Sequence, residues 1–231
     1  MYPNVQAYDR GTMFSPDGKL YQVEYAIVAT KKGATAIGLI IDNGVVLAGE
    51  KTYEAPFVIY KTVQKVFRID HLIGATYSGM VSDGLHLINI LRNKAQTHRL
   101  LYNEAETIDG LAKDISEEMQ VATQYGGLRP YAVSLLLGGV DPNAVVFEID
   151  PSGSPVGYKA RAIGQGRDKA TEILSKEFKD GMSKEEGVSL AVDIIKKVHE
   201  GKFYPQNVEV SVIEKSKGFY YLTDEEIEEL L

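Results

Sequence analysis

The chain has 231 residues, 44% of them hydrophobic and 25% charged, which is a globular composition with enough apolar residues for a full core. Its formal net charge of −7 has the wrong sign for neutralising phosphates, so we expect no nucleic-acid partner. Cysteine is absent, which excludes disulfides and thiolate chemistry and favours a reducing, cytoplasmic location. No apolar run is long enough to span a bilayer, so we expect no membrane association.

A helical extension is predicted over residues 15–33 by the signals at its two ends. Ser15 is a preferred N-cap, Pro16 suits the first helical position, and Asp17 favours the positive end of the helix dipole. Gly33 supplies a stop. Apolar residues between these ends recur at helical spacing, which indicates a helix that packs on other parts of the chain.

The rest of the chain alternates pairs of strands with pairs of helices. Strands are predicted at 35–41, 45–48, 66–69, 72–77, 131–140, 145–149, 157–163, 208–214 and 218–222, and helices at 80–102, 107–125, 167–178, 183–199 and 224–231. Short connections such as Asp42-Asn43-Gly44 indicate antiparallel hairpins. This order favours an α+β fold, a four-layer αββα sandwich of two antiparallel sheets between helical layers. No linker divides the sequence, so a single domain is predicted over residues 1–231.

Local motifs for cofactor binding are weak. Gly164-Gln165-Gly166 precedes a predicted helix, as a phosphate-binding loop would, but a third glycine is missing and the preceding hairpin is not a parallel βαβ unit. A tight turn is the favoured interpretation, and a dinucleotide-binding protein remains an alternative. The four histidines are dispersed without ligand spacing, so no metal or cofactor is expected.

Several segments, in order along the chain, resemble the proteasome α subunits. They are Tyr8-Asp9-Arg10, the run from Phe14 to Ala26, Lys31 to Ala36, Asn43 to Ala48, Tyr77 to Met80, Thr123 to Tyr131, and Asp150 to Gly153. The resemblance runs essentially from end to end. It implies the αββα fold of the N-terminal-nucleophile hydrolases and the role of a non-catalytic α subunit of an archaeal-type proteasome core particle.

Catalysis by this chain is not expected from the resemblance. Active β relatives carry a threonine freed as the N-terminal residue, tuned by a lysine and an acidic side chain. The equivalent position here is about Ala34, flanked by Thr35, with Lys65 and Glu50 as the helper pair. Ala34 has no hydroxyl, and residues 15–33 precede it. The alternative is an active threonine-type hydrolase subunit in which processing exposes Thr35.

The resemblance instead implies a gate and an activator pocket. The α subunits form a heptameric outer ring, which stacks on β subunits, gates the entry of unfolded protein, and binds the C-terminal tails of regulatory ATPases or other activators. The gate comprises residues 1–14 with the matching positions Tyr8, Asp9, Arg10, Pro16 and Tyr25. The pocket between adjacent α subunits has Lys65 at its base and Gly18, Leu20, Gly33, Gly79 and Met80 as its walls. The loop that narrows the channel matches Tyr125, Gly126 and Gly127.

Two departures from the family pattern concern these sites. The spacer Gly11-Thr12-Met13 is one residue shorter than expected, which affects the path of the gate. Ile27-Val28 replaces a common Arg-Glu pair, so an arginine of the activator pocket is absent and the choice of activator is left open. Activator tails carry a penultimate tyrosine, which the end of this chain lacks.

Overall fold

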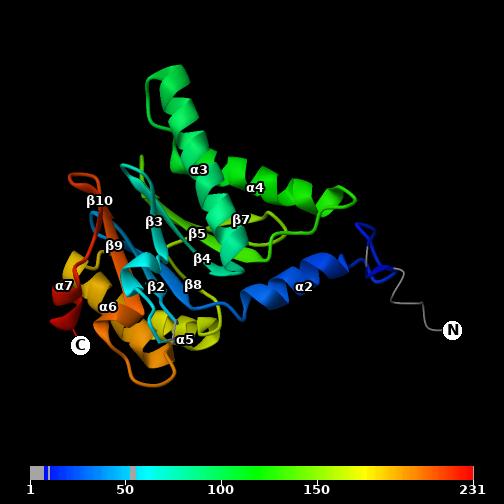
Figure 1. Cartoon of the computed structure of the whole chain (residues 1–231). Coiled ribbons are helices and arrows are strands. Elements are labelled where there is room, and N and C mark those ends of the chain that lie inside the picture. Colours follow the sequence, from blue (N-terminus) through cyan, green and yellow to red (C-terminus); the bar gives the residue numbers. More distant parts are fainter. Residues whose placement is uncertain (1–7, 10, 53–55, 231) are drawn as a thin grey trace.

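The computed structural model describes residues 8–9, 11–52 and 56–230. Two antiparallel five-stranded sheets stack face to face, with helices covering both outer faces (Figure 1). One sheet has the order β10-β9-β2-β1-β8 and the other β3-β4-β5-β6-β7. The predicted αββα sandwich is therefore confirmed.

The elements follow the alternation predicted from the sequence. The strands are β1 Ala36–Ile41, β2 Gly44–Glu50, β3 Val66–Asp70, β4 Ile73–Gly79, β5 Val133–Val140, β6 Ala144–Ile149, β7 Pro155–Tyr158, β8 Ala160–Ile163, β9 Val208–Glu214 and β10 Gly218–Tyr221. The helices are α2 Tyr21–Thr30, α3 Val81–Tyr102, α4 Ile108–Gln124, α5 Arg167–Glu177, α6 Lys184–Val198 and α7 Asp224–Glu228, with short 3₁₀ turns η1 Tyr60–Thr62 and η2 Pro205–Asn207.

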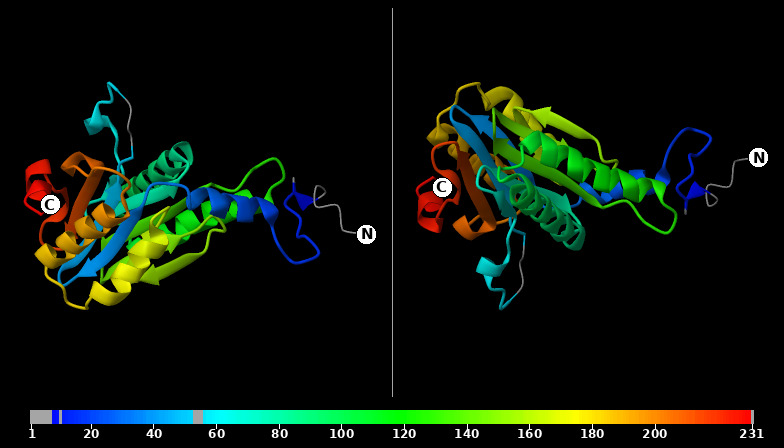
Figure 2. Two further views of the ribbon diagram at one scale, coloured as in Figure 1. Left: turned by 90° about the horizontal axis from the view of Figure 1, so that it is seen from below. Right: turned by 90° about the horizontal axis from the view of Figure 1, so that it is seen from above.

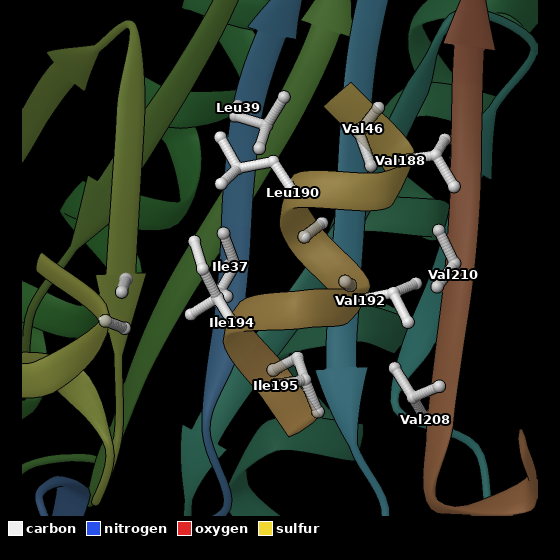
Figure 3. Close-up of a cluster of buried hydrophobic side chains, with 14 of the residues drawn as sticks. Ile37, Leu39, Val46, Val188, Leu190, Val192, Ile194, Ile195, Val208 and Val210 are labelled. Carbon is white, nitrogen blue, oxygen red and sulfur yellow. The ribbon is translucent and has the colours of Figure 1, made fainter. Parts of the chain in front are cut away.

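Three apolar layers hold the sandwich together. The layer under α6 packs Leu190 and Ile194 over Leu39 and Ile37 of β1, and Val192 toward β9 (Figure 3). A second layer joins α3 and α4 to the other sheet, and a third fills the space between the sheets. Both faces of the central strands are thus buried, which explains why β2 and β5 read as apolar runs rather than as alternating patterns.

The N-terminal helix begins later than predicted, at Tyr21 rather than at Ser15. Residues 15–19 form a closed turn in which the Gly18 N–H donates to the Ser15 carbonyl over 2.8 Å, and the Ser15 N–H donates to the carbonyl of Lys19 over 2.9 Å. Gly18 adopts a φ of 74°, in the left-handed region, so a helix cannot continue through it. Pro16 therefore occupies the first central position of a turn, where proline is equally favoured.

The strand predicted at 157–163 is wrong, because the chain crosses there from one sheet to the other. Residues up to Tyr158 pair with β6, whereas Ala160 onward pairs with β1. The carbonyl of Lys159, between the two strands, accepts from the Ile40 N–H over 2.8 Å. This stretch thus contributes one strand to each of the two sheets.

The N-terminal elements lie at one end of the molecule. Helix α2 contacts β4 and β5 and extends from the end of the sandwich away from α7 (Figure 2). Residues 56–63, including η1, project sideways from the sheets in the same views. Among the helices described, none combines the length and the apolar character needed to cross a membrane.

Candidate functional site

The residues around the position equivalent to a catalytic threonine form hydrogen bonds that stabilise the fold. Glu50 accepts from the backbone N–H of Thr35 over 3.1 Å, and its other carboxylate oxygen lies 2.8 Å from His199 Nδ1. The Thr35 hydroxyl accepts from the Gly166 N–H over 3.0 Å. The nitrogen of Thr35 is a peptide nitrogen rather than a free amine, and Ala34 has no hydroxyl. Glu50 therefore braces this strand end, and position 34 holds no nucleophile.

The loop Gly164-Gln165-Gly166 supports the same segment. The Gln165 N–H donates to the Gly33 carbonyl over 2.8 Å. Gly164 has a φ of 93°, and a Cβ on it would lie 2.7 Å from the carbonyl oxygen of Ala34. These glycines permit close approach of two backbone segments, as the tight-turn interpretation predicts. The N–H groups of Gln165 and Gly166 donate to Gly33 and Thr35 rather than being free for a phosphate. Among the described residues, no cluster of three His, Asp or Glu side chains could hold a metal ion.

Lys65 lies at a cavity of about 690 Å³ that combines polar and apolar walls. Its ammonium donates to the carbonyl of Tyr77 over 3.2 Å and lies 4.8 Å from the centre of the Tyr77 ring. Burial lowers the pKa of Lys65 to about 8, although the carboxylates of Glu50 and Glu209 act in the opposite direction. Such a lysine gains more from a bound anion than an exposed lysine would, because its charge is poorly solvated.

Two of the predicted wall glycines meet at this cavity. A Cβ on Gly33 would lie 2.1 Å from the backbone nitrogen of Gly79. Gly79 has a φ of 119°, and its Cβ would lie 2.1 Å from the carbonyl oxygen of Ala132. A side chain at Gly33 would force the segment after α2 away from β4, and a side chain at Gly79 would clash with the backbone of Ala132 before β5. Both glycines are therefore required by the close packing beside the cavity.

The other predicted wall residues lie elsewhere. Gly18 is in the turn before α2, and Leu20 lines a second cavity, of about 480 Å³. Met80 follows Gly79, and its sulfur lies 3.4 Å from Nη2 of Arg129. Within one copy of the chain, the structure therefore brings Lys65 together with Gly33 and Gly79, but not with Gly18 or Leu20.

Two predicted gate residues are in contact at the start of α2. Hydrogen bonding to the nearby Asp9 carboxylate raises the pKa of Tyr25. Gln22 Nε2 donates to the Asp9 carbonyl, and Tyr21 stacks beside Tyr25. Pro16 lies in the preceding turn, Tyr8 is half-buried, and Arg10 lies outside the described residues.

The predicted pore loop lies beside residues that precede α2. Tyr125 is 61% exposed, and Gly127 has a φ of 89°. Gly126 and Gly127 line the 480 Å³ cavity together with Gly11, Thr12 and Met13. The short spacer before Phe14 therefore lines the same cavity as the predicted pore loop.

An ion pair that sequence reasoning missed fixes the base of this loop. Arg129 donates to both carboxylate oxygens of Asp83, over 2.6 and 2.8 Å, and the Ala132 N–H donates to the same group over 2.9 Å. The guanidinium holds the pKa of Asp83 below its usual value. The bidentate pair anchors the loop to the first turn of α3.

Comparison with known proteins assigns the whole chain to one family. A model for proteasome subunits matches residues 30–213, and a model for the N-terminal signature of the A-type proteasome subunits matches residues 8–29. The proteasome alpha subunit of Methanocaldococcus jannaschii is 45% identical over 97% of this chain and 87% of its own length. The corresponding protein of Methanothermobacter thermautotrophicus is 43% identical over 97% of this chain and 93% of its own length.

A third relative, from Pyrococcus horikoshii, is 43% identical over 99% of this chain and 88% of its own length. The N-terminal signature covers the turn and α2, which are the elements that precede the missing nucleophile. The chain thus belongs to the proteasome α subunits of archaeal type, the non-catalytic outer-ring subunits that assemble with other subunits into the core particle.

Proposed function

We propose that the chain is a single domain that forms a heptameric outer ring on β subunits in the cytoplasm, gates the entry of unfolded protein, and binds activators through their C-terminal carboxylates. Residues 1–14 act as the gate, residues 15–33 as the extension that carries it, and Tyr125, Gly126 and Gly127 as the loop that narrows the channel. The observation that carries the proposal is the cavity at Lys65.

The cavity supplies what a C-terminal tail needs. Lys65 places one counter-charge beside apolar side chains, which include Phe67, Val81 and Leu85. A terminal carboxylate would meet the ammonium while the preceding side chains contact the apolar wall. Several weak cavities around a ring would together hold one activator with several tails, because the second tail binds at a high effective concentration.

The contacts around α2 support the assignment of the gate. Asp9 interacts with Tyr25, and residues 11–13 line the same cavity as Gly126 and Gly127. A contact of this kind links the position of the N-terminal segment to α2. An interaction between a carboxylate and a tyrosine hydroxyl can break and re-form without unfolding the sandwich, as a gate requires.

The stoichiometry of the assembled ring tests the proposal. Native mass spectrometry of the chain co-purified with an archaeal-type β subunit is expected to show an α to β ratio of one, with α copies in multiples of seven. The chain purified without β subunits provides the comparison, since it reveals which assemblies it forms alone. A stable complex with any other number of α copies in its ring would overturn the heptameric assignment.

A further inference from the structure

The carboxylate of Glu209 contacts Lys51 on one side and Lys65 and Val66 on the other side of the residues that form part of the cavity wall. One oxygen accepts from the backbone N–H groups of both Lys65 and Val66, each over 2.7 Å. The other lies 3.3 Å from the ammonium of Lys51. The side chains of Lys51 and Glu209 are 11% and 17% exposed. A residue of β9 thus holds both the start and the end of residues 51–65.

Neighbouring bonds show that these two ends are fixed points. The Lys51 N–H donates to the Asn207 carbonyl over 2.7 Å. The Tyr221 hydroxyl donates to the Val66 carbonyl over 3.0 Å, and the Thr76 hydroxyl donates to the Lys65 carbonyl over 2.7 Å. Between the ends, residues 56–63 project from the sheets (Figure 2). Val58, Ile59 and Val63 of this segment line the cavity.

Three consequences follow from the charge and position of Glu209. Its two bonds to backbone N–H groups set the direction of the chain at Lys65. Its ion pair with Lys51 ties the residue that follows β2 to β9. Its negative charge also lies close enough to Lys65 to oppose the loss of that lysine's proton.

We propose that Glu209 is a positioning residue of the activator site, which fixes the backbone at Lys65 and Val66, pairs with Lys51, and places a negative charge near the Lys65 ammonium. This inference rests on the proposed function, because it takes the Lys65 cavity to be the place where a terminal carboxylate binds. Glu209 does not touch the tail and acts through its contacts with Lys51, Lys65 and Val66.

The charged and titratable groups around the Lys65 ammonium determine how removing Glu209 changes the pH dependence of carboxylate binding. They are Glu50 on β2, Glu209 on β9, Tyr77 on β4 and Lys32 after α2, the last two as residues that line the cavity. Removing the charge of Glu209 leaves Glu50 as the remaining acidic neighbour. Lys65 should then lose its proton at a lower pH, and binding of a carboxylate should decline at that lower pH. A purely structural role for Glu209 would not move this midpoint.

The test uses the assembled particle with full-length α chains. The probe is a fluorescently labelled peptide with tyrosine as its penultimate residue and a free C-terminal carboxylate, and the same peptide with a C-terminal amide is the control. Binding is measured by anisotropy from about pH 6 to pH 9. Glu209→Gln keeps an acceptor for the two N–H groups without the charge, whereas Glu209→Ala removes both. Glu214→Gln is the matched control, because Glu214 is on the same strand but accepts from Tyr220.

We expect Glu209→Gln to bind almost normally at about pH 6 but to lower the midpoint by about half a pH unit, which makes binding about threefold weaker above it. Glu209→Ala should lower the same midpoint and also weaken binding about tenfold at every pH, because the backbone anchor is lost. Glu214→Gln should match the unmodified particle. If Glu209→Ala does not assemble, Glu209→Gln decides.

Two results would overturn the inference while leaving the cavity assignment intact. One is unchanged binding in both Glu209 variants, and the other is weaker binding with an unmoved midpoint. Failure of the proposed function itself would look different. In that case the unmodified particle would bind the amide and carboxylate peptides equally, and Lys65→Ala would make no difference.

Discussion

Replacing Lys65 by alanine is expected to abolish activator-stimulated peptide hydrolysis by the assembled particle while assembly proceeds. The variant removes the counter-charge of the cavity. Losing one partner of a buried charge pair costs about 2–5 kcal/mol, which is at least about 30-fold in affinity for each cavity. Because an activator engages several cavities at once, these losses multiply, and stimulation should disappear rather than weaken. The measurement is the rate of peptide hydrolysis as activator is titrated.

Lys61→Ala is the matched control for this substitution. Lys61 is an exposed lysine in η1, four positions earlier on the segment that leads to Lys65. Replacing Lys61 changes the net charge by the same amount, and the Lys65 ammonium stays in the cavity. Retained stimulation in the Lys65 variant, or an equal loss in both variants, would remove Lys65 from the activator site.

Lys65 should also make activator binding, and therefore activator-stimulated hydrolysis, depend on pH. A pKa of about 8 means that Lys65 is charged below that pH and neutral above it. A terminal carboxylate binds the charged form, so affinity should be constant below pH 8 and fall toward about tenfold per pH unit above it. The sign follows from burial, which destabilises the ammonium in the free cavity, whereas a bound carboxylate stabilises it.

Deleting residues 1–10 is expected to raise the rate of peptide hydrolysis by the particle several-fold in the absence of any activator. The deletion removes Asp9 and with it the contact to the Tyr25 hydroxyl at α2. The deletion also removes the bond from Gln22 to the Asp9 carbonyl, but Ser15 to Lys19 and α2 stay in place because their backbone hydrogen bonds lie within the remaining chain. The measurement is the initial rate for a short fluorogenic peptide.

Activator saturation supplies the control for the deletion. With the gate already open, the shortened and the complete particles should hydrolyse the peptide at the same rate. If the deletion leaves the unstimulated rate unchanged, residues 1–10 do not obstruct the channel.

The layered fold was predictable because its signals are local. The turn at Asp42-Asn43 joins β1 and β2 as predicted, and Thr107 and Ser183 cap α4 and α6 through their hydroxyls. The error at 15–18 arose because Ser-Pro-Asp-Gly suits both a helix start and a turn. Gly18 decides between them through its left-handed backbone, which the sequence alone does not reveal. The error at 157–163 had another cause, since the partner strands β6 and β1 are distant in sequence.

The residues of the site were predictable only where they belong to a short sequence motif. Lys65, Gly33 and Gly79 were identified by resemblance, and they meet at one cavity. Glu209 was missed because it lies 144 residues from Lys65, and an acidic residue in a mostly apolar strand does not indicate its partner. The pair of Asp83 and Arg129 was missed for the same reason, since 46 residues separate them. Such partners are fixed by the packing of whole layers.

The central claim is that residues 15–33 and Ala34 turn a hydrolase scaffold into an entrance without a nucleophile of its own. The most direct measurement is peptide hydrolysis by the purified chain alone, compared with the same chain assembled with a β subunit that has an N-terminal threonine. We predict no hydrolysis by the chain alone at any concentration, and hydrolysis that appears only with the β subunit. Peptide cleavage by the chain alone, in proportion to its concentration, would contradict this account.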